Sequence, residues 1–331
     1  MTAKLRISDV AKHAGVSPAT VSRVMNGNPK VDPALVQRVQ DAAAELGYTA
    51  SPLARSLALG KTQTVAVLVP DLGNPTFQAI LRTLSRAAAG DGYHVLVADS
   101  AEVAADEAAL ALQARRRTDG IVLVAPRMPD DELAAALPRL APAVLVNRGG
   151  DGAPVVAADY GRGLRELIEH LRMLGHRRLL YLAGVPGSAS NARRVAAIAE
   201  ARAAHPDLDI AEAPCGTGFA DGSAAVATVR AHEATAVLAY NDLVAMGLLS
   251  ALHEEGVAVP HEVSVTGFDD IPFARYTTPP LTTASVPTDR MGELAWSAMR
   301  ALLEDDAAAP PVVLAPTLAV RGSTAAPPPA S

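Results

Sequence analysis

The stretch ISDVAKHAGVSPATVSRVMNG, residues 7–27, decides the fold of the first part of the chain. We expect a first helix that Ser8 caps and that ends at Gly15. A second helix is expected after Ser17, its cap, with Pro18 at the first helical position, where a missing N–H costs nothing. Because the turn between the two helices is only about three residues long, the pattern indicates a helix-turn-helix.

A third helix follows and completes a small bundle. Asp32 is its expected cap, Pro33 its first residue and Gly47 its end. Apolar side chains recur at helical spacing along all these segments, so each helix has one face to bury against the others. We therefore predict an all-α domain over residues 1–50.

The exposed face of the second helix is suited to reading DNA. Arg23 can donate two hydrogen bonds to the O6 and N7 atoms of guanine, whereas Pro18 and Ala19 can only contact apolar edges such as the thymine methyl group. The short polar side chains of this region are Ser17, Thr20, Ser22 and Asn26. Such side chains suit phosphate groups, which fix register rather than sequence. On spacing alone, an amphipathic helix with a solvated polar face explains the pattern equally well.

Charge is distributed unevenly along the chain. The formal net charge of the whole chain is −6, which by itself argues against nucleic acid as a partner. Residues 1–60, however, hold seven Lys and Arg against four Asp and Glu, a net of +3, so the remaining 271 residues carry −9. A basic head on an acidic body is typical of a polyanion-binding module joined to a domain that does not bind polyanions.

The cysteine content and the N-terminus indicate the compartment. Cys215 is the one cysteine, so no internal disulfide can form, as is usual in the reducing cytoplasm. The N-terminus has no apolar segment of a secretory signal, and no apolar run is long enough to span a bilayer. We therefore expect a cytoplasmic protein with no membrane partner.

From Thr64 onward, short apolar runs alternate with helical segments. The expected strands are residues 65–69, 94–97, 121–124, 144–146, 179–182, 237–239 and 263–265. Continuous apolar strands separated by helices predict parallel sheets that helices cover on both faces. Because about 260 residues exceed what one simple sheet needs, we expect two α/β lobes.

Polar side chains recur just beyond these strands. They are Asp71, Asn74, Asp99, Asn147, Arg148, Asp159, Asn241, Asp242 and Asp269. Ligands of open α/β sheets bind beyond the carboxyl ends of the strands, so the repetition predicts a shared cleft. Each residue taken alone is also explained as a helix cap, and for Asn74 and Asp242 capping is the favoured interpretation.

The motif of residues 7–27, followed by AELGY at residues 44–48, closely resembles the DNA-binding headpiece of the lactose-repressor (LacI/GalR) family. The resemblance gives residues 51–61 the role of a hinge helix and linker, which folds on operator DNA and lies in its minor groove. It makes Leu57 the wedge at the central base step, lets Ala54 bring two hinge helices close together and places Arg55 near phosphate. A helix this short does not persist alone in water, so coupling its folding to DNA binding is reasonable.

The resemblance extends over the body, residues 62–322. The segments DLGNPTF at 71–77, NDLVAMG at 241–247 and VTGFDDI at 265–271 look like the effector domain of the family, whose two lobes are similar to periplasmic sugar-binding proteins. The effector-binding positions that it implies are Asn74 and Phe77 in the first lobe, Asn147 and Arg148 at the lobe edge, and Arg194, Asn241 and Asp269 in the second lobe. Several positions depart from the family. Asn147 replaces the usual aspartate, Tyr160 stands where asparagine is common, and Ala197 and Ile198 replace the Gly-Phe that usually follows the pocket arginine.

As a whole, the resemblance implies an allosteric repressor. It would bind palindromic double-stranded operator DNA as a homodimer and answer to a small-molecule effector, a sugar or a related metabolite. The fold it implies is α/β, with an all-α helix-turn-helix headpiece joined to a two-lobed, parallel α/β domain like that of periplasmic binding proteins. Neither a cofactor nor a metal is expected. Residues 323–331, rich in alanine and proline, are expected to form a disordered tail.

Two other functions fit parts of the sequence. A ligand-binding protein without DNA function, such as a transport receptor, would need export, and no signal segment is present. An enzyme on the two-lobed fold would need a nucleophile–base pair, a metal cluster or a cofactor loop. His170 and His176 do not have metal-ligand spacing on one helical face, Cys215 has no neighbour that would activate it, and the glycine-rich loop at 184–191 lacks the phosphate-binding lysine. We interpret His176 instead as a cation at a helix end.

Overall fold

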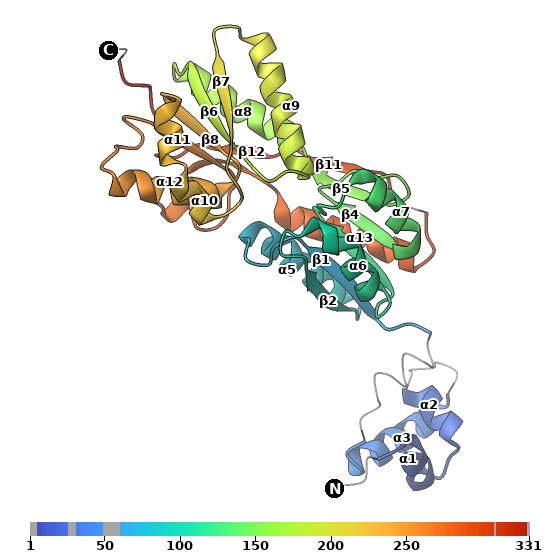
Figure 1. Cartoon of the computed structure of the whole chain (residues 1–331). Coiled ribbons are helices and arrows are strands. Elements are labelled where there is room, and N and C mark those ends of the chain that lie inside the picture. The colour runs from blue at the N-terminus through green and yellow to red at the C-terminus, as the bar shows by residue number, and fades with distance from the viewer. Residues whose placement is uncertain (1–4, 26–30, 49–59, 308, 330–331) are drawn as a thin grey trace. The chain divides into compact units, whose positions relative to one another are not determined.

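The computed structural model describes residues 5–25, 31–48, 60–307 and 309–329 (Figure 1). The chain divides into two compact units, one of Met1–Thr64 with Arg117–Asp119 and one of Val65–Arg116 with Gly120–Ser331. The sequence placed this boundary after Lys61. The N–H and the hydroxyl of Thr62 donate to Asp119 Oδ1, at 2.7 and 2.9 Å, and Asp119 directly precedes β3 (Gly120–Val124).

The N-terminal unit is a small helical bundle. Its helices are α1 (Ile7–Ala14), α2 (Pro18–Met25) and α3 (Pro33–Glu45). Val10, Val21 and Val39, one from each helix, have no exposed surface and form the centre of the core. The predicted apolar faces therefore meet one another.

Side chains set where these helices begin. Ser17 and Asp32 cap α2 and α3, as predicted, by accepting hydrogen bonds from N–H groups of the first turn. The prediction that Ser8 caps α1 is wrong. That helix begins two residues earlier, at Ile7 with Arg6 as its cap, because the Asp9 carboxylate accepts a hydrogen bond from Arg6 N at 2.8 Å and closes the first turn.

The second unit contains two six-stranded sheets, one in each lobe. The first sheet has the order β11-β5-β4-β3-β1-β2, with β1 (Thr64–Val69), β2 (His94–Asp99), β3 (Gly120–Val124), β4 (Ala143–Val146), β5 (Val155–Ala158) and β11 (Val312–Leu314). The second has the order β12-β10-β9-β8-β6-β7, with β6 (Arg178–Ala183), β7 (Asp209–Pro214), β8 (Ala236–Ala239), β9 (Ser264–Asp269), β10 (Thr282–Ser285) and β12 (Thr317–Ala319). Strand β12 runs antiparallel to β10, whereas β5, β4, β3 and β1, and likewise β7, β6, β8 and β9, pair in parallel. The predicted pair of parallel α/β lobes is confirmed.

Helices cover both faces of each sheet. Around the first sheet lie α5 (Pro75–Gly90), α6 (Ala104–Arg115), α7 (Asp130–Leu140) and α13 (Thr288–Leu303). Around the second lie α8 (Tyr160–Met173), α9 (Ala189–Ala204), α10 (Phe219–Ala224), α11 (Val226–Ala231), α12 (Asp242–Glu254) and the short η1 (Ala274–Tyr276). None of the helices in the described ranges is both long and apolar enough to cross a membrane.

Strand β1 shows why the apolar runs are continuous. Val65, Val67 and Val69 belong to the core cluster that α5 and α13 cover, while Ala66 and Leu68 belong to the cluster that α6 and α7 cover. Both faces of the sheet are therefore buried, and each strand position needs an apolar side chain.

The chain passes between the lobes from β5 to α8, from β10 to α13 and from β11 to β12. The strands expected from the sequence do not include the short apolar β5, and they also do not include β7, β10, β11 and β12. Three of these have partly exposed side chains, and β10, of sequence TTAS, is polar although its threonines are buried. Hydrophobic patterning cannot find strands of either kind.

The C-terminal segment is ordered where the sequence predicted a disordered tail. Ser323 has no exposed surface, and its hydroxyl donates to Val265 O at 2.6 Å and accepts from Thr282 N at 2.8 Å. Ala325 N donates to Ser264 Oγ at 3.1 Å. The prediction of disorder from residue 323 onward is therefore wrong for 323–325. Hydrogen bonds to the second lobe order these residues, although the alanine- and proline-rich composition of the segment favours disorder.

His176 also contacts this C-terminal segment. Its ring is fully buried, with Nε2 donating to Ala325 O and Nδ1 lying 2.9 Å from Thr235 Oγ1. Burial lowers the pKa of His176, although the bond to Ala325 opposes this effect. The structure does not support the interpretation of His176 as a helix-end cation, because burial of the ring disfavours its charged form.

Candidate functional site

A cavity lies between the two lobes, where loops that follow strands of both sheets meet. Its lining is Asn74, Thr76, Phe77, Glu102, Ala125 and Arg127 from the first lobe and Tyr160, Ser190, Arg194, Thr217, Tyr240, Asn241 and Asp269 from the second. The cavity volume is about 20 Å³, which is room for a water molecule and far less than the roughly 300 Å³ or more of a pocket that holds a small ligand. A ligand therefore enters only if the lobes separate or the lining side chains move.

The structure brings together five of the seven effector-binding positions implied by the sequence. Asn74, Phe77, Arg194, Asn241 and Asp269 all line the cavity. They come from segments far apart in the chain, because parallel strands of one sheet present their carboxyl ends at the same edge.

Arg194 is the most enclosed charged group of the cavity. It projects from α9, is 1% exposed, and its Cζ lies 4.6 Å from the ring centroid of Tyr160, 4.7 Å from that of Tyr240 and 4.1 Å from that of Phe268. Aromatic faces attract a guanidinium, so the three rings hold it in place. Neither Nε nor Nη1 of Arg194 has a hydrogen-bond partner. The site therefore holds a fixed cation with two unused donors.

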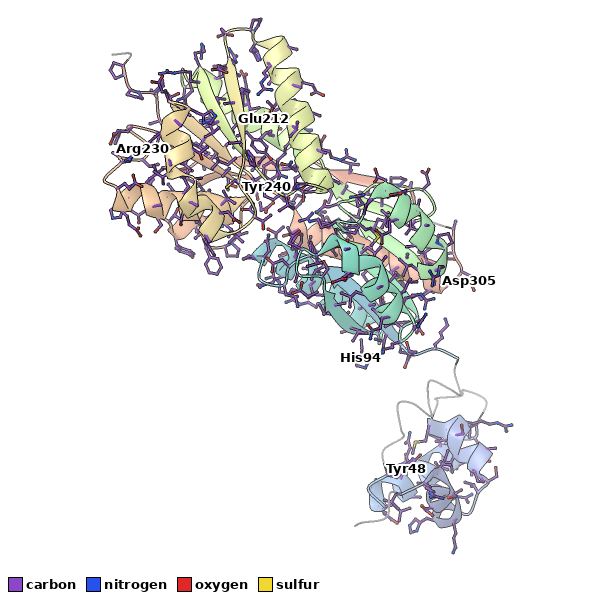
Figure 2. The ribbon with its side chains drawn as sticks, viewed as in Figure 1. Tyr48, His94, Glu212, Arg230, Tyr240 and Asp305 are labelled. Carbon is purple, nitrogen blue, oxygen red and sulfur yellow. The ribbon has the colours of Figure 1, made fainter. Side chains whose placement is uncertain are left out.

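Hydrogen bonds hold Tyr240, one of the rings that contact Arg194, in place. It follows β8 and lies in the interior of the second lobe, 6% exposed (Figure 2). Its hydroxyl lies 2.9 Å from Ser188 Oγ and 3.1 Å from Ser190 Oγ, at the start of α9. The contacts fix the ring beside Arg194, and they give the two serines a structural role.

Asp269 lies at the end of β9 and reaches across to the first lobe. Its Oδ2 accepts a hydrogen bond from Thr76 Oγ1 at 2.9 Å. Desolvation raises the pKa of Asp269 to about 6, although the charge of Arg194 and the bond to Thr76 oppose the shift. Its backbone φ of 108° is a conformation that side chains other than glycine rarely adopt. Such strain is typical of functional sites.

The asparagines of the cavity also begin helices. Asn74 Oδ1 accepts from Thr76 N at 2.9 Å at the start of α5, so its predicted role as a cap is confirmed. Asn241 caps α12 through a bond from Val244 N at 2.9 Å, and its Nδ2 donates to Thr217 O at 2.8 Å. Both side chains are thereby oriented before any ligand is present.

Asp242 does not cap a helix, contrary to the expectation from the sequence. It is fully buried, and its carboxylate accepts from Thr283 Oγ1 at 2.6 Å and from Ile271 N at 2.7 Å. Burial raises the pKa of Asp242 well above its usual value, and the charge of Asp269 adds to the effect. Asp242 thus fixes the loop that carries Asp269.

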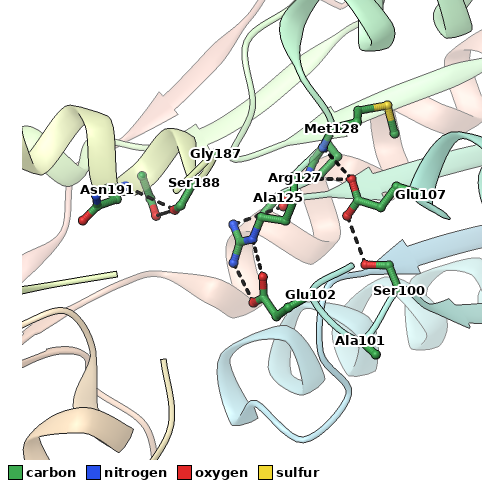
Figure 3. Close-up of polar contacts among 12 residues, drawn as sticks. Ser100, Ala101, Glu102, Glu107, Ala125, Arg127, Met128, Gly187, Ser188 and Asn191 are labelled. Atoms are coloured by element: carbon green, nitrogen blue, oxygen red, sulfur yellow. Dashed lines mark hydrogen bonds and ion pairs between the residues drawn. The ribbon is translucent and has the colours of Figure 1, made fainter. Parts of the chain in front are cut away.

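Sequence reasoning missed an ion pair in the wall of the first lobe (Figure 3). Arg127, 5% exposed, donates from Nε and Nη2 to the two carboxylate oxygens of Glu102, at 2.6 and 2.9 Å. The carboxylate holds the pKa of Arg127 above its usual value, although desolvation opposes the shift. The sequence did contain one indication of this residue, because Arg127 lies three positions after the predicted strand 121–124, where cavity residues are expected.

A buried carboxylate positions this pair. Glu107 on α6 has no exposed surface and accepts from Arg127 N at 2.6 Å, Met128 N at 2.7 Å and Ser100 Oγ at 3.0 Å (Figure 3). Burial nevertheless raises the pKa of Glu107. The loops after β2 and β3 are therefore tied to α6 behind the cavity.

The other two implied effector positions do not line the cavity, so the structure does not support them as effector contacts. Arg148 donates from Nη2 to Met128 O and Asp130 Oδ1, at 2.9 and 2.7 Å, and from Nη1 to Gly187 O in the second lobe at 3.2 Å. Asn147 Oδ1 accepts from Ala158 N at 3.0 Å. The Arg148 guanidinium, which was expected to bind the effector, thus already donates its hydrogen bonds to backbone carbonyls and a carboxylate.

The candidate DNA-reading face lies on α2 and the turn before it. Ser17, Pro18, Ala19 and Arg23 are exposed, and Thr20 and Ser22 are half-buried. Val21 and Val24 point into the core instead. The predicted positions Asn26, Ala54, Arg55 and Leu57 lie outside the described residues.

The two units together define a class of protein. The first presents the exposed face of a second helix, which is how a helix-turn-helix reads a major groove. The second has a polar cavity at the carboxyl ends of two parallel sheets, which is where such folds bind small molecules. This combination is that of a ligand-responsive, DNA-binding regulator.

Comparison with known proteins agrees with this class. Residues 6–51 match the family model of bacterial regulatory proteins, lacI family, and residues 168–324 match that of a periplasmic binding protein-like domain. The HTH-type transcriptional regulator GalS of Salmonella typhimurium is 35% identical over 299 residues, which cover 88% of each chain. The HTH-type transcriptional repressor CytR of Escherichia coli K12 is 31% identical over 302 residues, 86% of each chain. The lac repressor dimer bound to operator and the anti-inducer ONPF superposes with a TM-score of 0.88 at 26% identity, covering 98% of this chain and 100% of that chain.

The chain belongs to the lacI family of bacterial regulatory proteins. It is a DNA-binding transcriptional regulator with an effector domain like that of periplasmic binding proteins. The family and the fold class predicted from the sequence are thereby confirmed.

Proposed function

We propose that this chain is a repressor that binds a palindromic operator as a homodimer. We also propose that a small molecule bound in the interlobe cavity controls the affinity of the dimer for this operator. The observation that carries the proposal is Arg194, enclosed between the lobes with two donors unpaired. Buried polar groups are nearly always paired, so an unpaired cation facing a cavity indicates a ligand that completes it.

The lobes are joined at the cavity by contacts that a ligand would disturb. Thr76 of the first lobe donates to Asp269 of the second, and Arg148 of the first lobe donates to Gly187 O of the second. A ligand that takes Asp269 as a partner competes with Thr76 and thereby changes the balance between lobe positions. It can shift that balance only by the difference between its affinities for the two arrangements.

On the DNA side, we assign sequence reading to Arg23 and phosphate contacts to the short polar residues around it. Leu57, Ala54 and Arg55 keep the roles that the family resemblance implies, in a hinge helix in the minor groove. One headpiece reads only a few base pairs, so a two-fold partner is needed to specify a site. The lac repressor structure named above is a dimer on its operator, which supports the same arrangement here.

We also propose that the chain is not an enzyme and returns its ligand unchanged. Its relatives are transcriptional regulators. Within the described ranges, no group of three or more His, Cys, Asp and Glu side chains is placed to hold a metal ion. Because its proposed partner is chromosomal DNA, we place its action in the cytoplasm.

Selection from random duplex DNA tests the proposal. The full-length chain would be incubated with a library of random 20-base-pair inserts, and bound DNA amplified and sequenced over several rounds. We expect enrichment of a near-palindrome, bound by two chains per duplex. Bound DNA with no enriched sequence, or a selected site that one chain saturates, contradicts the proposal.

A further inference from the structure

The loop that carries Asp269 has an unusual backbone. Asp269 ends β9 and Asp270 follows it, and their backbone φ angles are 108° and 59°. Residues other than glycine rarely adopt positive φ angles. Such conformations persist only where the surrounding structure fixes them, so other residues must hold this loop in place.

One contact that holds the loop comes from Asp242. Its Oδ2 accepts from Ile271 N at 2.7 Å, and its Oδ1 accepts from Thr283 Oγ1 at 2.6 Å. Gly267 makes room for this carboxylate, because a Cβ there would lie 2.1 Å from Asp242 Oδ1. Asp242 therefore fixes the backbone that directly follows the two strained residues.

A second contact comes from the C-terminal segment. Arg321 Nη2 donates to Asp270 Oδ1 at 2.6 Å, and the two side chains are 18% and 15% exposed. Arg321 is itself held in place, because its Nη1 donates to Leu281 O at 2.8 Å and its N–H donates to Thr282 Oγ1 at 2.9 Å. The guanidinium therefore fixes the side chain of the residue next to Asp269.

Arg321 also lies close to a crossover between the lobes. The chain leaves the first lobe after β11 and enters the second as β12, which ends two residues before Arg321. Ser323, two residues further on, is fixed to the second lobe by its bond to Val265 O at 2.6 Å. The segment that holds Asp270 is therefore a direct continuation of the chain that joins the lobes.

We propose that Arg321 is a positioning residue for the effector cavity, which acts through Asp270 to keep Asp269 turned toward the first lobe. Asp269 contacts that lobe through the bond from Thr76 Oγ1, at 2.9 Å. Without Arg321, the loop relaxes from its strained conformation and the Asp269 carboxylate moves away from Thr76. The proposal rests on the proposed function, since it concerns the regulation of the same cavity.

A purely structural ion pair has a different consequence. If Arg321 only stabilises the second lobe, its loss lowers the free energy of unfolding and leaves the positions of the lobes unchanged. If Arg321 positions Asp269, its loss weakens a contact that exists only while the lobes are together. The equilibrium between lobe positions therefore separates the two roles.

Single-molecule energy transfer in the full-length chain measures this equilibrium without a ligand or DNA. The dyes are attached through Asp131→Cys on α7 and Glu254→Cys on α12, exposed positions in the two lobes, in a Cys215→Ala background. We expect Arg321→Gln to shift the equilibrium toward separated lobes by about fivefold or more. Arg321→Lys keeps a charge for Asp270 and should restore part of the wild-type distribution. A folded Arg321→Gln variant with the wild-type distribution overturns the proposal.

A double variant tests whether Arg321 acts through Asp269. In Thr76→Val the donor to Asp269 is absent, so the bond that Arg321 supports no longer exists. Arg321→Gln should therefore add less than about twofold to the shift caused by Thr76→Val, whereas independent effects multiply. Shifts that multiply overturn the proposal.

Arg202→Gln is the matched control. Arg202 also pairs with a carboxylate in the second lobe, that of Glu212 at 2.9 Å, and donates to a backbone carbonyl, Ile210 O, but none of these residues lines the cavity. This variant should leave the lobes together, and a shift equal to that of Arg321→Gln overturns the proposal. If Arg321→Gln does not fold, Asp270→Asn removes the charge of the pair from the other side. Asparagine tolerates this backbone conformation, so a shift in the same direction is expected and a wild-type distribution overturns the proposal.

The proposed function and this proposal fail separately. Failure to select any palindrome, together with the predicted shifts in lobe position, overturns the proposed function alone. A selected palindrome whose affinity responds to a bound compound, together with a wild-type distribution in Arg321→Gln, overturns only the role of Arg321.

Discussion

The bond from Thr76 Oγ1 to Asp269 Oδ2 crosses between the lobes inside the cavity, at 2.9 Å. Thr76→Val keeps the shape of the side chain and removes the donor. A hydrogen bond to a charged group contributes about 1.5–3 kcal/mol, and about 1.4 kcal/mol corresponds to tenfold in an equilibrium constant. Because the bond exists only while the lobes are together, we expect the variant to shift the equilibrium toward separated lobes by about 10- to 150-fold.

Single-molecule energy transfer measures this shift. Dyes would be attached through Asp131→Cys on α7 of the first lobe and Glu254→Cys on α12 of the second, both exposed positions, in a Cys215→Ala background. The variant should populate a state of lower transfer efficiency that is rare in the wild type. The measurement needs no knowledge of the ligand.

Two variants serve as controls. Thr76→Ser keeps the hydroxyl and should behave like the wild type. Thr83→Val, on the same helix, removes a hydroxyl that bonds to Ala79 O and Ile80 O within α5, so it should leave the lobes together even if it lowers stability. The reasoning is refuted if Thr76→Val has the wild-type distribution, or if Thr83→Val separates the lobes equally.

Other parts of the molecule give further predictions. Arg23→Ala should weaken binding to the selected operator by about 1–3 kcal/mol and relax preference at one base pair per half-site, measured by competition with point-mutated operators; an equal loss on random duplex would contradict its role. Removal of residues 323–331 deletes hydrogen bonds to and from Ser323 and Ala325 and should lower the free energy of unfolding in urea by about 2–4 kcal/mol, whereas removal of 326–331 alone should change it little. Because desolvation raises the pKa of Asp269 to about 6 from a usual 3.8, the folded chain binds a proton there that the unfolded chain lacks between these values. The wild type should therefore gain stability relative to Asp269→Asn as the pH falls from 7 to 5, and a constant difference would remove Asp269 as the titrating group.

Local chemistry accounts for the parts that could be predicted from the sequence. Ser17 and Asp32 cap their helices because a cap needs only the residue and the next turn. The apolar strands were found because buried parallel strands leave no polar positions. Arg194 and Asp269 were found because they stand in motifs of the family, and the cavity places them together.

The features that the sequence did not predict depend on contacts between segments that are distant in the chain. The Glu102–Arg127 pair joins two loops, and nothing local indicates which charges will meet. Arg148 belongs to the family pattern, but carbonyl groups of neighbouring loops occupy its guanidinium. Ser323 lies in a segment whose composition indicates disorder, and only the second lobe supplies its partners.

The central claim is that occupation of the interlobe cavity decides how tightly the dimer holds its operator. The most direct test is the dissociation constant for the selected palindrome, by fluorescence anisotropy, with and without a saturating compound that binds the wild type in calorimetry. We expect a change of about 5- to 150-fold in the wild type and none in Asp269→Ala. Without the compound, the affinity of Asp269→Ala for the palindrome should match that of Thr76→Val, because both variants lose the bond between Thr76 and Asp269. Equal dissociation constants with and without the bound compound in the wild type would contradict the account.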